Sequence, residues 1–172
     1  MIERKGEVTF QGGPLTLLGE RPTVGQEMPD FTVLANDLSE VKLSSYRGKV
    51  VLLSLVPSLD TPVCAVETRR FNEAASALGD GAVVLTVSMD LPFAQARWCA
   101  AEGVERVVTA SDHRDAQAAE ATGMMIQELR LLARAVFVLD RDGKIVYEQL
   151  VPEVTDEPDY DAALAAARKL MP

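Results

Sequence analysis

The sequence predicts an α/β domain in which a mixed central sheet is flanked by helices and preceded by an N-terminal β-hairpin. The first observation is a set of apolar runs of strand length: VVLLSLV at residues 50–56, AVVLTVS at 82–88 and AVFVL at 135–139. Nearly unbroken apolar runs are typical of strands that are covered on both faces. The second observation is helical periodicity between these runs, because strands that alternate with helices are typical of layered α/β domains.

Two hairpins are expected before the first of these runs. In EVTFQGGPLTLLG, residues 7–19, two short alternating stretches flank Gly12-Gly13. Glycine adopts positive φ without steric cost, so this pair suits a tight turn. The segment FTVLANDLSEVKL, residues 31–43, predicts a second pair of strands around Asn36-Asp37.

Four helices are expected from apolar side chains at helical spacing and from glycines that follow the last turn. Proline near a helix start and glycine after its end agree with the usual asymmetry of helix termini. The expected helices cover residues 64–78, ended by Gly79; 92–102, with Pro92 near the start and Gly103 at the end; 112–122, with Ser111 as the cap and Gly123 after it; and 158–170.

The end of the chain adds a hairpin and makes the sheet a mixed one. The run AVFVL is followed by Asp-Arg-Asp-Gly and then by KIVYEQL, residues 144–150, which together read as an antiparallel pair. A thioredoxin-like layout satisfies this order of strands and helices. No repeat, low-complexity tract or linker divides the chain, so we expect a single domain over residues 1–172, with a flexible N-terminus over about residues 1–6.

Composition and charge disfavour several classes of function. The chain has 26 acidic and 17 basic residues, and its formal net charge of −9 argues against nucleic acid and anionic membranes as partners. No apolar run approaches the roughly 20 residues of a membrane span. The N-terminal segment lacks the apolar stretch of a secretory signal, so a cytoplasmic location is expected. Two cysteines and one histidine, without zinc-ligand or nucleotide-binding motifs, predict no metal and no cofactor.

Cys64 stands where a strand is expected to stop and a helix to start, in the stretch VPSLDTPVC. Thr61 is a good N-cap and Pro62 suits the first helical position, which places Cys64 in the first turn. Backbone N–H groups there lack intrahelical acceptors and the helix dipole favours negative charge, so a thiol in this position loses its proton more easily. The alternative is a small buried hydrophobe, because free cysteine is often buried and Cys64 lies seven residues before Phe71.

The residues around Cys64 carry a family resemblance. Pro57-x-x-x-Thr61-x-x-Cys64 matches the P-x-x-x-T-x-x-C signature of the peroxiredoxins. Beyond its first few residues, the whole chain resembles the thiol peroxidase type of peroxiredoxin, an atypical two-cysteine type. The stretches that carry this resemblance are PSLDTPVC, RRFNEAA, SMDLPFAQARWC, LARAVFVLD and EPDYDAALAAARKL.

The resemblance implies a role for each of five residues. Cys64 would be the peroxidatic cysteine, which attacks the O–O bond and becomes a sulfenic acid. Thr61 would hydrogen-bond the thiolate and the peroxide, Pro57 would shield the pocket from water, and Arg134 would hold the thiolate and polarise the peroxide. Cys99 would be the resolving cysteine, which closes a disulfide within the same chain.

The implied activity is that of an antioxidant oxidoreductase. It would reduce hydrogen peroxide and organic hydroperoxides to water and alcohols, with thioredoxin as the reductant that reopens the disulfide. Family members are typically homodimers. The resemblance leans toward alkyl and lipid hydroperoxides, and the residues themselves leave the preferred hydroperoxide open.

The residues taken alone leave other interpretations open. Thr61 can be only a cap, Pro57 only a strand terminator and Cys99 only a buried thiol in mid-helix. His113 is expected on the surface in the first turn of its helix, and Glu67 as a first-turn acid that suits the dipole. Spacing alone does not single out one arginine among Arg134, Arg69, Arg70 and Arg130.

Three alternatives to a two-cysteine peroxidase also stay open. One is a one-cysteine peroxidase in which Cys99 is incidental. Another is a thiol–disulfide oxidoreductase, against which the missing C-x-x-C counts, and the third is a non-catalytic binding module. A disulfide needs Cα atoms within about 7 Å, so a mid-helix Cys99 is expected to reach Cys64 only after local unwinding.

Overall fold

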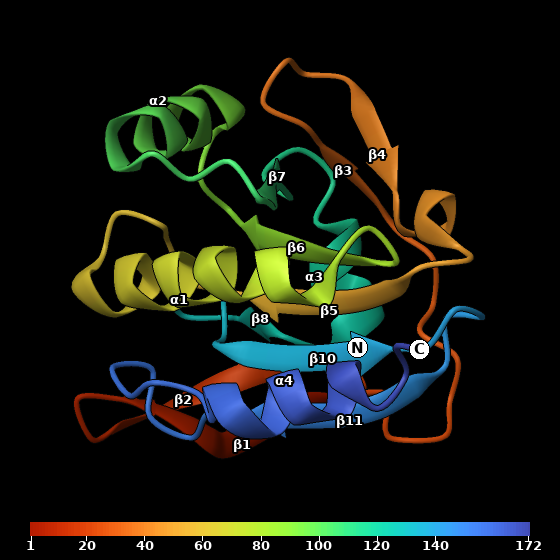
Figure 1. Ribbon diagram of the computed structural model, residues 1–172. Helices are drawn as coiled ribbons and strands as arrows, with labels where there is room; N and C mark the ends of the chain where they lie inside the picture. Colours follow the sequence, from red (N-terminus) through yellow and green to blue (C-terminus); the bar gives the residue numbers. More distant parts are fainter.

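Two sheets of different size form the frame of the protein, which is described by a computed structural model of residues 1–172 (Figure 1). The strands are β1 (Glu3–Phe10), β2 (Gly13–Leu18), β3 (Thr32–Leu34), β4 (Glu40–Lys42), β5 (Val50–Leu55), β6 (Ala82–Ser88), β7 (Val107–Ser111), β8 (Met125–Ile126), β9 (Leu131–Leu132), β10 (Ala135–Leu139) and β11 (Ile145–Leu150). The larger sheet has the order β11-β10-β5-β6-β7-β3-β4, and the smaller sheet the order β1-β2-β8-β9. Only β5–β6 and β6–β7 are parallel pairs, so the central sheet is mixed, as predicted.

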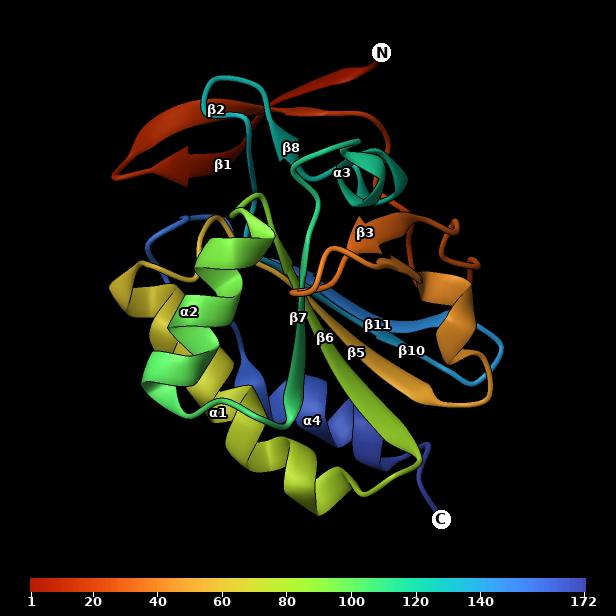
Figure 2. The same ribbon diagram turned by 90° about the horizontal axis from the view of Figure 1, so that it is seen from above.

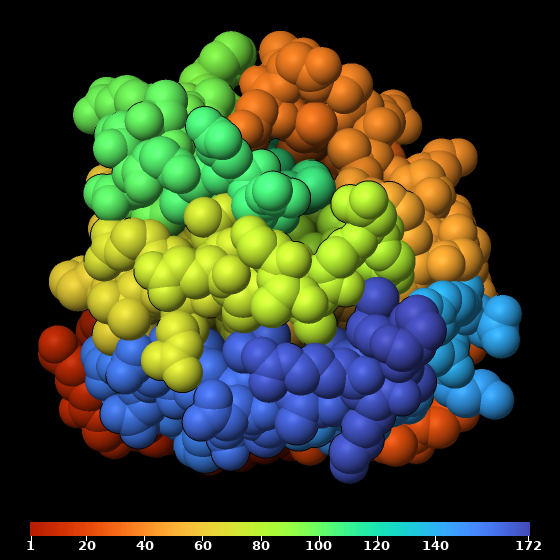
Figure 3. All heavy atoms as spheres, viewed as in Figure 1, coloured from red at the N-terminus to blue at the C-terminus, as the bar shows by residue number.

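Helices cover one side of the larger sheet and the smaller sheet covers the other (Figure 2). Seen from above, α1, α2 and α4 lie on one side, whereas the β1–β2 hairpin, β8 and α3 lie on the opposite side. Figure 3 shows α2, α1 and α4 as green, yellow and blue bands across the face that they cover. The helices are α1 (Pro62–Leu78), α2 (Pro92–Glu102), α3 (Gln117–Thr122) and α4 (Tyr160–Arg168), with a short 3-10 helix at Leu43–Tyr46.

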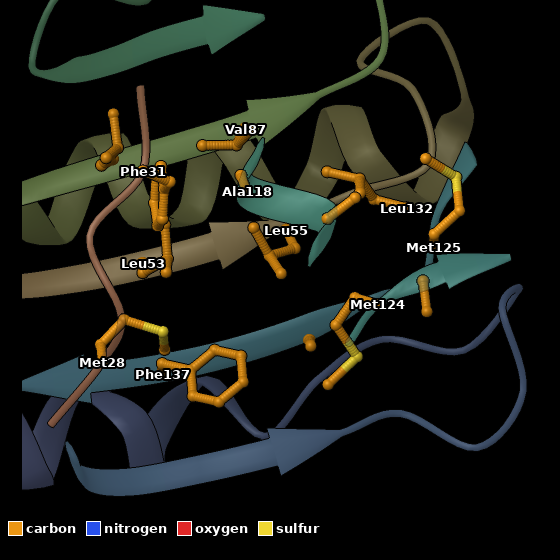
Figure 4. Packing of buried hydrophobic residues seen from close by; sticks show 14 of the residues in the cluster. Met28, Phe31, Leu53, Leu55, Val87, Ala118, Met124, Met125, Leu132 and Phe137 are labelled. Atoms are coloured by element: carbon orange, nitrogen blue, oxygen red, sulfur yellow. The ribbon is translucent and has the colours of Figure 1, made fainter. Parts of the chain in front are cut away.

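The central strand β5 is buried on both faces, which explains its unbroken apolar run. Its odd-numbered side chains, Leu53 and Leu55 among them, belong to a core cluster of 24 residues that faces the smaller sheet and α3 (Figure 4). Val50 and Leu52 point the other way, into a cluster of 13 residues under α1 and α4. Successive strand residues alternate between faces, so a strand between two apolar layers cannot show a polar face.

The same alternation of side chains along β5 also places a polar residue beneath α1. Ser54 shares the helix-facing side of β5 with Leu52, so its hydroxyl lies beneath α1. Strand β10 runs antiparallel to β5 and places Ala135 opposite Leu55. Arg134 therefore enters the sheet beside the carboxyl end of β5, next to the start of α1.

The third helix is shorter than the sequence predicts. It begins at Gln117, and Ser111 is the last residue of β7 rather than a helix cap. The Asp112 carboxylate accepts backbone N–H groups of Ala118 and Ala119 at 3.1 and 2.8 Å, and the helix starts only after this turn. The expected cap at Ser111 and the expected helix start at residue 112 were wrong, because the side chain that accepts the first N–H groups of α3 is that of Asp112, several residues before the helix.

Other local features also differ from the sequence-based expectations. His113 lies in the turn before α3 and not in a helix. The sequence does not predict β7, β8 or β9; the last two are only two residues long, which is too short for a periodic signal. At the N-terminus, β1 begins at Glu3 and Gly19 N–H donates to the Ile2 carbonyl at 2.8 Å, so ordered pairing extends into the expected flexible segment.

The remaining boundaries agree closely with the predictions. The two N-terminal hairpins, β5, β6, the β10–β11 hairpin and helices α1, α2 and α4 occur where the sequence places them. Gly79 and Gly103 follow α1 and α2 with φ of 77° and 66°, a conformation that glycine adopts without strain. None of the helices has both the length and the apolar character that crossing a membrane requires.

Candidate active site

Cys64 lies in the first turn of α1 and its side chain is fully buried. Thr61 is the N-cap, with an extended backbone, and its Oγ1 accepts the Cys64 backbone N–H at 3.3 Å. The same hydroxyl donates to the Ser58 carbonyl at 3.2 Å, which ties the cap to the preceding loop. Pro62 is the first helical residue, so the predicted helix start is confirmed.

Arg134 is the arginine that reaches Cys64. Its Nη1 donates to Cys64 Sγ at 3.1 Å and to Glu67 Oε2 at 2.8 Å, and its Nε donates to the Val154 carbonyl at 3.0 Å. Only 2 % of its side chain is exposed. The guanidinium is thus held in one orientation by three acceptors, and one of them is the sulfur of Cys64.

The other candidate arginines lie on the surface. Arg69 pairs with Glu102 at 2.8 Å, and Arg70 lies 3.5 Å from Asp161 with its guanidinium over the Tyr160 ring. Arg130 is an exposed turn residue with a φ of 51°. Among the four arginines that the sequence left as candidates, Arg134 is therefore the one that contacts Cys64 in the structure.

Glu67 is the residue that sequence reasoning missed. It was expected as a first-turn acid in the field of the helix dipole, but its side chain is fully buried. Its Oε1 accepts the Ser54 hydroxyl at 2.8 Å, and its Oε2 accepts Arg134. A signal was present in the sequence: Glu67 is three residues after Cys64 and four before Phe71, which puts all three on one helix face.

Burial and neighbouring charges have opposite effects on the pKa values of Glu67 and of Arg134. Burial raises the pKa of Glu67, and the charge and hydrogen bond of Arg134, with the hydroxyl of Ser54, offset this only in part. Burial by itself would lower the pKa of Arg134, but the electrostatic interactions and hydrogen bonds with Glu67 and Cys64 outweigh burial and hold that pKa above its usual value. The guanidinium therefore keeps its positive charge, and a buried cation stabilises negative charge on the sulfur that it contacts.

The loop before α1 supplies apolar side chains next to Cys64. Pro57 is buried and directly follows Val56, whose N–H donates to the Val87 carbonyl at 3.0 Å. Val56, Leu59 and Cys64 form a small apolar cluster of their own. The thiol thus faces apolar side chains on one side and the guanidinium on the other.

Cys99 has a different neighbour from Cys64. It lies on α2, half-buried, with its Sγ 3.4 Å from Thr109 Oγ1 on β7. Thr109 in turn donates to Asn36 Oδ1 at 3.1 Å. Both cysteines are free thiols. The structure therefore brings Thr61, Cys64 and Arg134 together, with Pro57 in the loop that leads to them, whereas the Cys99 side chain lies against Thr109.

Trp98 connects the two cysteine regions. Its partly buried ring packs against the cluster of Val56, Leu59 and Cys64, while the neighbouring Cys99 faces β7. No group of three or more histidine, cysteine, aspartate or glutamate side chains is arranged to hold a metal ion. The chemistry that this site offers is that of a buried thiol held against a fixed cation.

Comparison with known proteins places this arrangement in a class. The Redoxin family matches residues 23–164, so the chain belongs to that family. The crystal structure of a peroxiredoxin-like protein from Aquifex aeolicus superposes with a TM-score of 0.90 at 41 % identity, covering 97 % of this chain and 99 % of that one. The expected thioredoxin-like fold is thereby confirmed.

Two relatives define the type within the family. The thiol peroxidase of Bacillus subtilis is 55 % identical over 165 residues, which cover 96 % of this chain and 98 % of that protein. The thiol peroxidase of Staphylococcus aureus strain MRSA252 is 56 % identical over 164 residues, covering 95 % and 99 %. The resemblance to the thiol peroxidase type of peroxiredoxin is confirmed, and the protein is an enzyme of the peroxidase class.

The buried ion pair predicts a stability difference between two glutamates. Glu67→Gln removes the anion that compensates Arg134, and leaving a buried charge unpaired costs about 3 kcal/mol or more. Glu102→Gln is the matched control, because Glu102 pairs with Arg69 on the surface and such pairs contribute at most about 1 kcal/mol. Urea unfolding of both variants measures the two losses, and equal losses would contradict the assignment of Glu67 to a buried ion pair.

Proposed function

We propose that the protein reduces hydrogen peroxide and organic hydroperoxides through Cys64 as the peroxidatic cysteine, with Cys99 as the resolving cysteine and thioredoxin as the reductant. The observation that carries the proposal is the 3.1 Å hydrogen bond from Arg134 Nη1 to the buried Cys64 Sγ. Membership of the family supports the same assignment. Thr61 and Pro57 complete the proposed site as a hydrogen-bonding and a shielding residue.

In the first step, the Cys64 thiolate attacks the terminal oxygen of the hydroperoxide and the O–O bond breaks. The sulfur is oxidised to a sulfenic acid, and the alkoxide that leaves takes up a proton to become the alcohol, or water when the substrate is hydrogen peroxide. Donors aimed at the developing negative charge lower the barrier of such a displacement. Arg134 suits this task because its planar fork presents several N–H groups while two other acceptors hold it in place.

Thr61 and Pro57 have supporting parts in this step. The Thr61 hydroxyl lies at the helix start beside Cys64. Its one proton, which it donates to the Ser58 carbonyl in the structure, would turn toward the thiolate, while its oxygen would accept from the incoming peroxide. Pro57 has no N–H group and is buried next to the same loop, so it limits access of water to the sulfur. Less water around the thiolate strengthens its interaction with the guanidinium.

In the second step, the Cys99 sulfur attacks the Cys64 sulfenic acid. A Cys64–Cys99 disulfide forms, and the hydroxyl of the sulfenic acid leaves as water with the proton from the Cys99 thiol. Cys99 faces Thr109 in the reduced protein, so α2 has to open locally before the two sulfur atoms meet.

In the third step, a dithiol of the thioredoxin type reduces the disulfide. Exchange transfers two electrons and two protons to the enzyme, and the reductant leaves as a disulfide. A homodimer and a cytoplasmic location are carried over from the family as parts of the same proposal. Sedimentation of the purified protein and fractionation of cells test these two parts.

Replacing the peroxidatic sulfur should abolish the activity. Cys64→Ser should consume no peroxide, because a hydroxyl has no comparable anionic population at neutral pH. The measurement is peroxide consumption by the purified variant with thioredoxin, its reductase and NADPH. Turnover near the wild-type rate would remove Cys64 from the mechanism.

Replacing the resolving sulfur should separate oxidation from turnover. Cys99→Ser should consume one equivalent of peroxide and then stop, because its sulfenic acid finds no partner thiol in the chain. Cys64 should then over-oxidise to sulfinic acid more readily than in the wild type, which intact-mass measurement detects. Full thioredoxin-driven turnover by this variant, or a Cys64–Cys64 link between chains, would favour the one-cysteine mechanism instead.

A further inference from the structure

Asp90 lies between β6 and α2, and its carboxylate binds the loop that precedes Cys64. Its Oδ1 accepts the Ser58 hydroxyl at 2.7 Å, and its Oδ2 accepts the Leu59 backbone N–H at 2.8 Å. The Ser88 hydroxyl donates to the same Oδ2 at 2.7 Å. Three hydrogen bonds therefore fix one carboxylate between strand β6 and the peroxidatic loop.

Ser88 continues this network into α2. The Gln95 side-chain amide, which is 1 % exposed, donates to Ser88 Oγ at 2.9 Å and to the Ala110 carbonyl at 2.8 Å. The Ser111 hydroxyl adds a bond to the Asp90 carbonyl. A continuous path of hydrogen bonds thus leads from the first turn of α2, through Ser88 and Asp90, to Ser58 and Leu59.

An apolar contact runs parallel to this polar path. Leu59, which Asp90 holds by its backbone, packs in the same small cluster as Cys64, and Trp98 of α2 packs against that cluster. Trp98 is the neighbour of Cys99 in the sequence. Helix α2 therefore reaches the peroxidatic loop at two points, one through Asp90 and one through Trp98.

We propose that Asp90 is a positioning residue that holds the peroxidatic loop and the start of α2 together while Cys64 reacts, and that this contact opens before Cys99 reaches Cys64. The inference rests on the proposed function, in which both cysteines take part. Hydrogen bonds to a carboxylate are stronger than those between neutral groups, so this contact is a substantial part of what opening has to break. Asp90 itself touches neither sulfur; it acts through Ser58 and Leu59.

The two steps of the reaction should then respond in opposite directions when this contact is weakened. When the loop before Cys64 is more mobile, the sulfur spends less time in the position from which it attacks the peroxide, so the oxidation step slows. A less firmly held α2 opens more often, so disulfide formation becomes faster and the sulfenic acid has less time to over-oxidise. A residue with only a general structural role would not raise the rate of one step while lowering that of the other.

The test uses Asp90→Asn in the full-length protein, with Asp112→Asn as the matched control. Like the half-buried Asp90, Asp112 has a carboxylate that accepts several hydrogen bonds, here the backbone N–H groups of Ala118 and Ala119, but it is buried and caps α3 on the opposite side of the sheet. Rapid mixing with hydrogen peroxide, followed by acid quench, thiol alkylation and mass analysis, measures both the rate of sulfenic acid formation and the rate of Cys64–Cys99 disulfide formation.

For Asp90→Asn we expect the ratio of the disulfide rate to the oxidation rate to rise about tenfold, in line with the loss of one charged hydrogen bond. The fraction of sulfinic acid at high peroxide should fall, and Asp112→Asn should leave the ratio unchanged. Ser58→Ala, which removes one bond and leaves the carboxylate in place, should shift the ratio in the same direction by a smaller factor. It also keeps the test decisive if Asp90→Asn does not fold.

An unchanged ratio in both Asp90→Asn and Ser58→Ala, or a fall in both rates together, would overturn the role of Asp90. That outcome is distinct from a failure of the proposed function. If the wild-type protein itself formed no Cys64–Cys99 disulfide on oxidation, the resolving role of Cys99 would be wrong, and with it the opening step that Asp90 is inferred to control.

Discussion

The organisation of this protein depends on one buried cation. The Arg134 guanidinium lies inside the domain, where its charge has to be balanced by anions and its N–H groups by acceptors. Glu67 supplies the anion, the Val154 carbonyl accepts Nε, and Cys64 offers its sulfur to Nη1. Because the guanidinium is fixed by two groups that do not react, it is already in place when the sulfur acquires negative charge.

The fold brings these groups together from three distant parts of the chain. Antiparallel pairing of β10 with β5 puts Arg134 at the carboxyl end of β5, where α1 begins with Thr61 and Cys64. Apolar side chains cover both faces of β5. Ser54 is the polar residue of this strand, and its hydroxyl donates to Glu67 beneath α1. Strand register and helix start thus determine the site together.

Local signals in the sequence predicted the helix start, the long buried strands and the position of Cys64, because caps, prolines and apolar runs act over a few residues. Arg134 followed only from the family resemblance, since it lies 70 positions from Cys64 and their contact depends on the pairing of β10 with β5. Glu67 was missed because a buried acid and a solvated first-turn acid look alike in sequence. The late start of α3 and the direction of Cys99 toward Thr109 likewise depend on side-chain partners outside the local segment.

The most direct measurement is the second-order rate constant for oxidation of Cys64 by a hydroperoxide, followed by stopped-flow fluorescence of Trp98, the single tryptophan. Arg134→Lys keeps the positive charge but loses the planar fork. With Arg69→Lys as the surface control, we predict a loss on the order of 100-fold for the Arg134 variant and no change for the Arg69 variant. An Arg134→Lys protein that is folded and reacts at the wild-type rate would contradict the role of the fixed guanidinium.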